Sequence, residues 1–387
     1  MRSKVMRWVV VVGTVALLGA GGCTSSGGSG RDNTANTNTG TSSRPTVRTG
    51  HLIEPGPAAE LGYRISWSRD LNLPGDQSLA SATVVGDLLI TVERPDNFIT
   101  ARSVRDGQLK WKIKLGGPLE EFYAPNRDGD RVFINSQTRM YTLRANSGEV
   151  TSVANLDVAV NAPPVYDPST NFAIFGGANG LIFAHSVENN FAHWRYKLPG
   201  QITSPPVRTD LDVFVVDGMG NYVMLETSTG RIQWRNRTLG SVVAAPALQG
   251  NEVLIASRDR KLYALNRTSG QDAWLYLGAE RPLTASPVAL GRIIVLPLPP
   301  DGGIVAIRAL DGEELWRSDV NAKPIIERDR DLLLYTSRAM HLLDLEDGEV
   351  LIEAPTLPLQ QVIPGPNDSL ILLSPEGRML RLSRTAG

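Results

Sequence analysis

From about residue 62 to the end of the chain, short hydrophobic runs alternate with polar turns, and no helical period is visible. Residues 246–277 show the pattern best. Two apolar runs, at 253–256 and 261–265, are separated by a polar segment and followed by a run that carries Trp274. Short β-rich runs bounded by Gly, Asn and Asp are typical of strands joined by tight turns. The segment therefore predicts one sheet of four short strands.

This pattern repeats at intervals of about 40 residues, which is the length of one blade in a β-propeller. Two independent marks run in phase, a proline near the first strand and a Gly-x-x-x-Trp motif near the fourth. The glycines of this register are Gly107, Gly148, Gly230, Gly270, Gly312 and Gly348. The tryptophans are Trp67, Trp111, Trp194, Trp234, Trp274 and Trp316. The repeat predicts an all-β, eight-bladed propeller with four strands in each blade.

Three copies depart from the Gly-x-x-x-Trp motif. Asn190 stands where the glycine before Trp194 is expected, and Ser152 and Ile352 replace the tryptophan in two other copies. Glycine at a tight turn permits positive φ, and tryptophan can cover the gap between adjacent sheets with a large apolar face. We therefore interpret the motif residues as blade-packing residues and not as a ligand-binding stack.

The two ends of the repeat region complement each other. The last copy ends after its third strand, at residues 379–382, whereas the first recognisable element, 63–67, carries Trp67 with no blade before it. We expect this N-terminal strand to complete the eighth blade and to close the ring. Closure removes exposed sheet edges, which are templates for aggregation.

The first thirty residues have the pattern of an export signal. Basic residues precede an apolar run, 8–18, that is too short to span a membrane, and small residues then lead to Cys23. This arrangement resembles the bacterial lipobox, whose cysteine is acylated and becomes the new N-terminus after cleavage. The resemblance implies a signal peptide at 1–22 and a lipid anchor at Cys23, facing the extracytoplasmic side. A plain secretory signal with an incidental cysteine is the alternative.

The segment after Cys23 differs in composition from the rest of the chain. Residues 24–50 are rich in Ser, Thr, Gly and Asn, with almost no large apolar residue. Such a segment cannot bury enough surface to offset the entropy of ordering. We expect residues 23–61 to form the lipidated cysteine and a disordered tether, and residues 62–387 to form the propeller.

Charge and chemistry-bearing residues exclude several functions. The formal net charge is −1, so the chain has no bulk electrostatic attraction for nucleic acid. Cys23 is the only cysteine, which excludes an internal disulfide and a cysteine metal cluster. His51, His185, His193 and His341 show no metal-ligand spacing, so we expect no metal site.

The strand, Asx-rich turn and Gly-x-x-x-Trp pattern resembles the PQQ-like (quinoprotein alcohol dehydrogenase-like) propeller repeat over residues 62–387. With its lipobox, the chain is most similar to the non-enzymatic lipoprotein branch of that family. This branch includes β-barrel assembly machinery lipoproteins, which implies a scaffold, and actinobacterial lipid-anchored propellers, which imply only an envelope protein. The dehydrogenases use a disulfide of adjacent cysteines, and Cys23 has no such neighbour. We therefore expect neither enzymatic activity nor a cofactor.

One loop interrupts the repeat in a way that suggests a contact surface. In the sixth blade, Leu296, Pro297, Leu298, Pro299 and Pro300 form an unusually apolar, proline-rich stretch. We take it as the candidate partner loop of a monomeric, lipid-anchored scaffold that binds envelope proteins through its rim. Binding of a sugar, peptide or lipid in the central channel is the alternative, and a PQQ-dependent dehydrogenase is the least favoured function.

Overall fold

The structure is a computed structural model that describes residues 50–385 except 76 and 299–301. The expected signal peptide, Cys23 and the expected tether as far as residue 49 therefore lie outside the described residues. A folded unit begins at His51. Among the described residues, no helix is long and apolar enough to cross a membrane.

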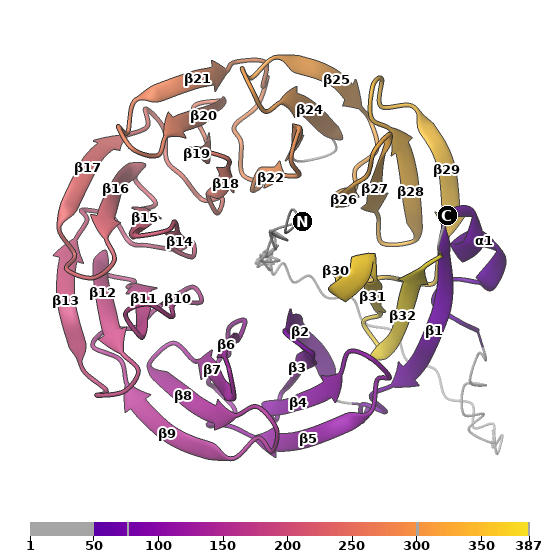
Figure 1. Cartoon of the computed structure of the whole chain (residues 1–387), viewed down its shortest axis with the longest axis horizontal. Coiled ribbons are helices and arrows are strands. Elements are labelled where there is room, and N and C mark those ends of the chain that lie inside the picture. The colour runs from indigo at the N-terminus through magenta and orange to yellow at the C-terminus, as the bar shows by residue number, and fades with distance from the viewer. Residues whose placement is uncertain (1–49, 76, 299–301, 386–387) are drawn as a thin grey trace, which may run out of the picture. The chain divides into compact units, whose positions relative to one another are not determined.

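The folded unit consists of eight antiparallel sheets of four strands, arranged as blades in a ring (Figure 1). In each blade the first strand lies nearest the centre and the fourth lies at the outer rim. The strands of blades 1 to 4 are β2 (Ser78–Val85), β3 (Leu88–Arg94), β4 (Phe98–Ser103), β5 (Leu109–Lys114); β6 (Asn126–Asp128), β7 (Arg131–Asn135), β8 (Arg139–Arg144), β9 (Val150–Asn155); β10 (Val165–Asp167), β11 (Phe172–Gly176), β12 (Leu181–Ser186), β13 (Ala192–Lys197); β14 (Val207–Arg208), β15 (Asp212–Val216), β16 (Asn221–Glu226) and β17 (Ile232–Arg237). The strands of blades 5 to 8 are β18 (Ala247–Gln249), β19 (Glu252–Ser257), β20 (Lys261–Asn266), β21 (Asp272–Tyr276); β22 (Val288–Ala289), β23 (Ile293–Pro297), β24 (Ile304–Arg308), β25 (Glu314–Ser318); β26 (Lys323–Glu327), β27 (Asp331–Tyr335), β28 (Ala339–Asp344), β29 (Val350–Pro355); β30 (Gln361–Pro364), β31 (Leu370–Leu373), β32 (Arg378–Arg384) and β1 (Tyr63–Asp70). The prediction of an eight-bladed, all-β propeller is confirmed.

The eighth blade is shared between the two ends of the folded unit. β1 is its outer strand and pairs antiparallel with β32, from Tyr63 opposite Arg384 to Asp70 opposite Arg378. Beyond the strands, the Thr385 backbone N–H and hydroxyl both donate to the Gly62 carbonyl, at 3.0 Å. The predicted closure of the ring by the N-terminal strand is therefore present.

Each tryptophan packs against the glycine turn of the following blade, not against the glycine of its own motif. All six glycines of the register have φ between 70° and 78°. A Cβ added to any of them would lie 2.3 to 2.9 Å from ring atoms of the preceding blade's tryptophan. These positions therefore need glycine for two reasons, the left-handed backbone and the close approach of an indole ring.

The indole N–H groups add a polar link to this contact. Five of the six donate to the carbonyl three residues before the glycine, at 2.8 to 3.1 Å, on Val104, Ala145, Thr227, Arg267 and Leu345. Trp274 packs on Gly312 without the corresponding bond. The pairing of a buried N–H with a carbonyl avoids the cost of an unsatisfied donor in the interface between blades.

A β-bulge explains the fixed spacing between the glycine and the tryptophan. In blade 1, Ala101 pairs with Trp111 and Arg102 pairs with Leu109, so Lys110 is the extra residue. The same shift recurs at the equivalent position of the other blades, including β1 just before Trp67. A bulge bends the strand and increases its twist, which sets the orientation of the residue that follows.

The departures from the motif are matched across the interface between blades. Blade 2 carries Ser152 in place of the tryptophan, and blade 3 carries Asn190 in place of the glycine. Asn190 keeps a positive φ of 56°, and its Nδ2 donates to Ser152 Oγ at 3.1 Å. A polar pair thus replaces the ring–glycine contact at this one boundary.

Ile352, the other replacement, packs against a buried cluster that includes residues of the N-terminal segment. That segment is folded, which corrects the expected start of the propeller domain. Residues 51–61 were expected to belong to a disordered tether, but they form α1 (Pro55–Glu60) and a bridge from Ile53 to Thr356. Leu52, Ile53, Ala58 and Leu61 are buried in one cluster with residues of blades 7 and 8, and Ile352 packs against it. The segment thus packs beside β29 of blade 7.

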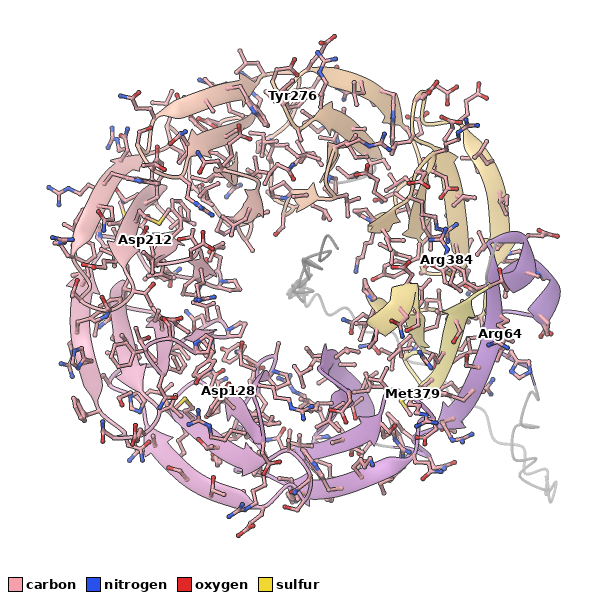
Figure 2. The ribbon with its side chains drawn as sticks, in the orientation of Figure 1. Arg64, Asp128, Asp212, Tyr276, Met379 and Arg384 are labelled. Carbon is pink, nitrogen blue, oxygen red and sulfur yellow. The ribbon has the colours of Figure 1, made fainter. Side chains whose placement is uncertain are left out.

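Polar side chains also connect neighbouring blades, as the ring of sticks in Figure 2 shows. Tyr276 of β21 donates to Glu314 of the next blade at 2.6 Å, and Asp128 of β6 accepts from Tyr166 at 3.1 Å. The short helix η1 (Pro366–Asp368) joins β30 to β31 within blade 8. Contacts between blades therefore combine an apolar interior with hydrogen bonds nearer the surface.

The antiparallel order gives the propeller two different faces. One face, here called the loop face, carries the connections from second to third strands and those from each outer strand to the next blade. In blade 1 these are residues 95–97 and 115–125. The opposite turn face carries the tight turns, including the glycine turns, such as 86–87 and 104–108. The longer connections, which are free to vary without disturbing the sheets, thus lie on the loop face.

Replacing Gly270 by Ala tests the contact between tryptophan and glycine. We expect the free energy of unfolding to fall by about 2–4 kcal/mol, from backbone strain and overpacking against Trp234. Gly250→Ala is the matched control, because Gly250 also has positive φ but no heavy atom within 4 Å of the added Cβ. Urea unfolding followed by tryptophan fluorescence measures both. Equal losses in the two variants would show that the indole contact contributes nothing.

The polar pair between blades 2 and 3 offers a reciprocal test. Ser152→Trp with Asn190→Gly should rebuild the contact seen at the other boundaries, with the Val187 carbonyl in the acceptor position. Each single change should destabilise, and the pair should show a favourable coupling free energy of about 1–3 kcal/mol in a double-mutant cycle of urea unfolding. Additive effects would contradict this account of the repeat.

Candidate functional site

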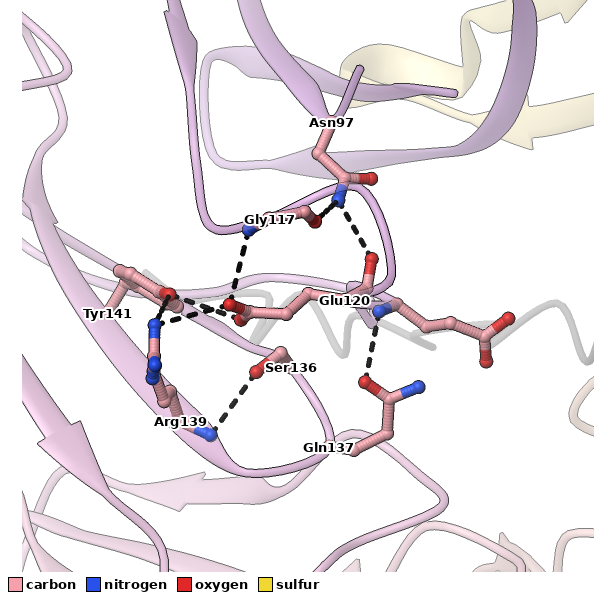
Figure 3. Close-up of polar contacts among 8 residues, drawn as sticks. Asn97, Gly117, Glu120, Ser136, Gln137, Arg139 and Tyr141 are labelled. Atoms are coloured by element: carbon pink, nitrogen blue, oxygen red, sulfur yellow. Dashed lines mark hydrogen bonds and ion pairs between the residues drawn. The ribbon is translucent and has the colours of Figure 1, made fainter. Parts of the chain in front are cut away.

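The connection from β5 to β6 on the loop face is fixed by a hydrogen-bond network (Figure 3). Asn97, itself buried, donates from Nδ2 to the carbonyls of Gly117 at 2.6 Å and Glu120 at 2.9 Å. The Glu120 carboxylate accepts from the Gly117 N–H at 3.3 Å, and from Arg139 and Tyr141 at 3.2 Å. The loop is thus held from both neighbouring blades.

Leu119 lies at the tip of this fixed connection and is 96% exposed. On its other side, the Glu121 N–H donates to Gln137 Oε1 at 3.0 Å, and the Glu121 carboxylate pairs with Arg94 at 3.2 Å. A large apolar side chain on a rigid loop is pre-organised for binding, because little conformational entropy remains to be lost. Leu119 is therefore a candidate anchor for a partner.

A second group of exposed apolar side chains lies on the loop-face connections of blades 4 to 6. Met219, Leu239, Val243 and Leu277 are between 43% and 78% exposed. The backbone around Leu239 is fixed, because its N–H donates to the Tyr263 hydroxyl, which in turn donates to Asp259. We call Leu119 and these four residues the loop-face apolar set. Sequence reasoning missed them, because isolated apolar residues in connections form no pattern.

The proposed partner loop of blade 6 is only partly where the sequence placed it. Leu296 is fully buried in β23, within a cluster that includes Leu254 and Leu262 of blade 5. It pairs with Val305 and cannot contact a partner, so this part of the prediction is wrong. The prediction failed because this apolar run is the end of a strand, β23, that is buried on both faces.

The rest of that loop lies at the edge of a cavity. Pro297 and Leu298 line a cavity of about 350 Å³ on the loop face, together with residues of blades 7 and 8. Pro299 and Pro300 lie outside the described residues. Of the five residues predicted to contact a partner, Pro297 and Leu298 therefore stay candidates.

The buried carboxylates of Glu93 and Asp167 accept hydrogen bonds from neighbouring side chains of the propeller. Glu93 accepts from Thr100 and from Lys112, both at 2.6 Å. Asp167 accepts from Arg208 at 2.9 Å and from nearby hydroxyls. Burial of Asp167 opposes its ionisation, but the hydroxyl bonds and Arg208 outweigh it and hold the pKa of Asp167 below its ordinary value. Neither side chain is placed to act as a general acid or base.

The histidines occupy ordinary strand and surface positions. His51 and His193 are exposed, whereas His185 in β12 and His341 in β28 are buried with no hydrogen-bond partner for either ring nitrogen. Burial lowers the pKa of both, against opposing effects of Asp157 on His185 and of Glu353 on His341. Within the described part of the chain, no group of three His, Cys, Asp or Glu side chains is placed to hold a metal ion.

Known proteins resemble this chain in sequence and in fold. A family model described as outer membrane protein assembly factor BamB matches residues 178–333. BamB of Yersinia pestis is 28% identical over 214 residues, covering 51% of this chain and 53% of that protein. The tetrathionate hydrolase of Acidithiobacillus ferrooxidans is 23% identical over 193 residues, covering 49% of this chain and 35% of that protein. The chain spans between 27% and 53% of the length of three curated BamB relatives.

The fold extends this likeness over most of the chain. The crystal structure of BamB from Moraxella catarrhalis superposes with a TM-score of 0.67 at 19% identity, covering 84% of this chain and 98% of that one. The blade motif and the closed ring define an eight-bladed β-propeller whose repeat resembles that of the PQQ-like class. Within that class, the chain resembles the outer membrane protein assembly factor BamB. The family resemblance predicted from the motif is therefore confirmed.

The buried histidines predict a pH dependence of stability. Their folded-state pKa lies below the unfolded value of about 6.5, so only the unfolded chain takes up these protons as the pH falls below it. Stability is therefore fully present above that value and falls below it, by at most about 1.4 kcal/mol per pH unit for each histidine.

The measurement is urea unfolding at pH 7.5, 6.5 and 5.5 for the protein and for His185→Gln/His341→Leu. The double variant should lose less stability on acidification, because two of the groups responsible are gone. His193→Gln, at an exposed position, should behave as the unchanged protein. Identical pH profiles for all three proteins would show that neither buried histidine contributes.

Proposed function

We propose that this protein is a lipid-anchored scaffold of the cell envelope that takes part in outer membrane protein assembly. It would act by binding protein partners through the loop face, and not by catalysis. The observation that carries the proposal is the loop-face apolar set, of which Leu119 and Leu239 lie exposed on backbone fixed by hydrogen bonds. A large apolar side chain on a rigid support is a favourable anchor for a protein partner.

The relatives support the assembly role by name. Several are outer membrane protein assembly factors, and one relative of lower identity is a hydrolase. The likeness in sequence covers about half of the chain or less, so the partners of those proteins are carried over only as part of this proposal. The structural bonds that occupy Glu93 and Asp167 favour binding over catalysis.

The anchor is the second part of the proposal. Acylation of Cys23 would tether the propeller to a membrane on the extracytoplasmic side, with the Ser/Thr/Gly/Asn-rich segment 24–50 between anchor and blades. More than one acyl chain is needed for stable anchoring, since one chain alone gives only reversible binding. Partners in the same membrane would then be held at high effective concentration.

Affinity capture from the native envelope tests the role of the loop face. The full-length protein is compared with Leu119→Ser/Leu239→Ser/Leu277→Ser and with the turn-face control Leu211→Ser/Leu310→Ser, whose two leucines are comparably exposed. We expect envelope-assembly proteins to be recovered with the wild type and the control. Their recovery should fall at least tenfold with the loop-face variant, because truncation of interface anchors typically costs 1–2 kcal/mol each.

Two results would contradict the proposal. Equal recovery with all three proteins would remove the loop face as the binding surface, provided that circular dichroism shows each variant folded. Recovery of no envelope-assembly protein with the wild type would remove the scaffold role. Mass spectrometry of the captured wild type reports the acyl mass on Cys23, and a Cys23→Ser variant released into the soluble fraction completes the test of the anchor.

A further inference from the structure

Three arginines meet at the boundary between blade 8 and blade 1, and we call them the arginine cluster. They are Arg69 of β1, Arg381 of β32 and Arg102 of β4. Met379, labelled in Figure 2, pairs with Arg69 and marks the place. The consecutive carbonyls of residues 105–107, in the glycine turn of blade 1, accept in that order from Nη1 of Arg381 at 3.2 Å, Nη2 of Arg69 at 3.2 Å and Nη1 of Arg102 at 3.3 Å. Three guanidinium groups therefore surround one tight turn.

The cluster stands at repeat positions that carry no permanent charge in the other seven blades. Opposite the tryptophan position, where blade 8 has Arg381, the others have Ala, Thr, Met or Leu (residues 101, 142, 184, 224, 264, 306 and 342). Two residues after the tryptophan position, where β1 has Arg69, they have Ile, Ala, Tyr, Asn or Ser (113, 154, 196, 236, 276, 318 and 354). At the position of Arg102 they have Leu, Ile or His (143, 185, 225, 265, 307, 343 and 382). The repeat thus requires arginine at none of these positions, yet all three departures occur at one boundary.

Closure of the ring does not require the cluster either. Trp67 packs on Gly107, and its indole N–H donates to the Val104 carbonyl at 3.1 Å, as at the other boundaries. A guanidinium carries five N–H donors. In bonds to described residues, Arg102 and Arg381 each use one donor and Arg69 uses two, all of them to neutral carbonyls. These bonds leave the positive charges without a counter-charge.

Grouped positive charge at a partly buried place is unfavourable without an anion. Among the ion pairs between described residues, none involves a member of the arginine cluster. Burial lowers the pKa of Arg102 and of Arg381; for Arg102, Glu93 opposes this effect and Arg69 adds to it. Glu93 is itself paired with Lys112 at 2.6 Å, so it is not free to neutralise the cluster. Binding of an anion would relieve this repulsion.

The neighbouring residues add further positive charge. Arg105 lies in the same turn and Lys110 follows it at the start of β5, and both are exposed. Asp106 is the carboxylate of the turn, and it accepts the Gln108 backbone N–H at 3.1 Å. The cations of this boundary therefore outnumber its carboxylates.

From this arrangement we infer that the arginine cluster binds a phosphate group. Arginine binds phosphate oxygens through paired, charge-assisted hydrogen bonds. A phosphate monoester carries close to two negative charges at neutral pH, so it matches several guanidinium groups better than a carboxylate does. The group would come from a soluble phosphate or from a lipid with a terminal phosphate. The inference goes beyond the proposed scaffold role and does not depend on it.

Isothermal titration calorimetry tests the chemistry of the site. The protein is the full-length chain with Cys23→Ser, which lacks the predicted acylation site, so that no result depends on the anchor. Inorganic phosphate is the probe, and acetate at equal ionic strength is the comparison, because salt screens exposed charges. We expect phosphate to bind roughly tenfold or more tightly than acetate.

Vesicles distinguish the two sources of phosphate. The same protein is sedimented with phosphatidylcholine vesicles that contain phosphatidic acid, whose headgroup is a phosphate monoester, and with vesicles of phosphatidylcholine alone. Binding only to the vesicles with phosphatidic acid assigns the site to a lipid headgroup. Binding of free phosphate without vesicle binding assigns it to a soluble phosphate.

Variants locate the binding in the cluster. Arg69→Met keeps the aliphatic part of an exposed side chain, and Arg381→Ala gives blade 8 the residue found at 101, 184, 264 and 306. Each should weaken phosphate or vesicle binding by roughly tenfold or more. Arg237→Met, which removes an exposed arginine from the outer strand β17, is the matched control and should bind as the parent does. Thermal unfolding shows whether each variant is folded.

Four results would overturn the inference. They are the absence of binding by both phosphate and the phosphatidic acid vesicles, equal affinity for phosphate and acetate, unchanged binding in Arg69→Met and Arg381→Ala, and an equal loss in Arg237→Met. A purely structural role would lower the unfolding temperature of the cluster variants and leave their binding unchanged. None of these outcomes bears on capture of envelope proteins, because the variants leave the loop-face apolar set intact.

Discussion

The structure depends on one contact, the packing of a tryptophan ring on the glycine turn of the next blade. The ring needs a neighbour without a Cβ, and the turn needs a positive φ, so a single residue type satisfies both demands. Because each contact joins two successive blades, the same pair repeated around the ring fixes the angle between sheets. The exceptions obey the same logic, since Ser152 and Asn190 meet across one boundary and Ile352 packs against the cluster that includes the N-terminal segment.

Features repeated in every blade could be predicted from the sequence, and features that occur once could not. The strands, the ring and the role of Trp67 follow from a period that appears in all copies. The ordered segment 51–61 was missed because its partners lie about 300 residues away and its Pro-Gly-Pro composition is typical of a linker. Leu119 was missed because a single leucine after Gly-Gly-Pro belongs to no periodic pattern. The hydrogen bonds of Asn97 and Glu120 that make its loop rigid are visible only in the structure.

The two faces of the propeller differ in how strongly blade packing constrains their residues. The turn face carries the glycines that set the blade packing, and a change there disturbs two sheets at once. The loop face carries longer connections, and few of their side chains are needed for packing between blades. Exposed apolar residues and the cavity lined by Pro297 and Leu298 can therefore exist there without loss of the fold. Substitutions on such a surface leave the ring intact.

The shared eighth blade has a consequence for how the chain reaches its folded state. β1 is the first strand to be synthesised, yet the residues that hold it are the last, and the bond from Thr385 to Gly62 joins positions 323 residues apart. Contacts of such high sequence separation form slowly, because loop closure must be completed before they contribute. Until β1 pairs with β32, the eighth blade lacks its outer strand and the ring is not closed.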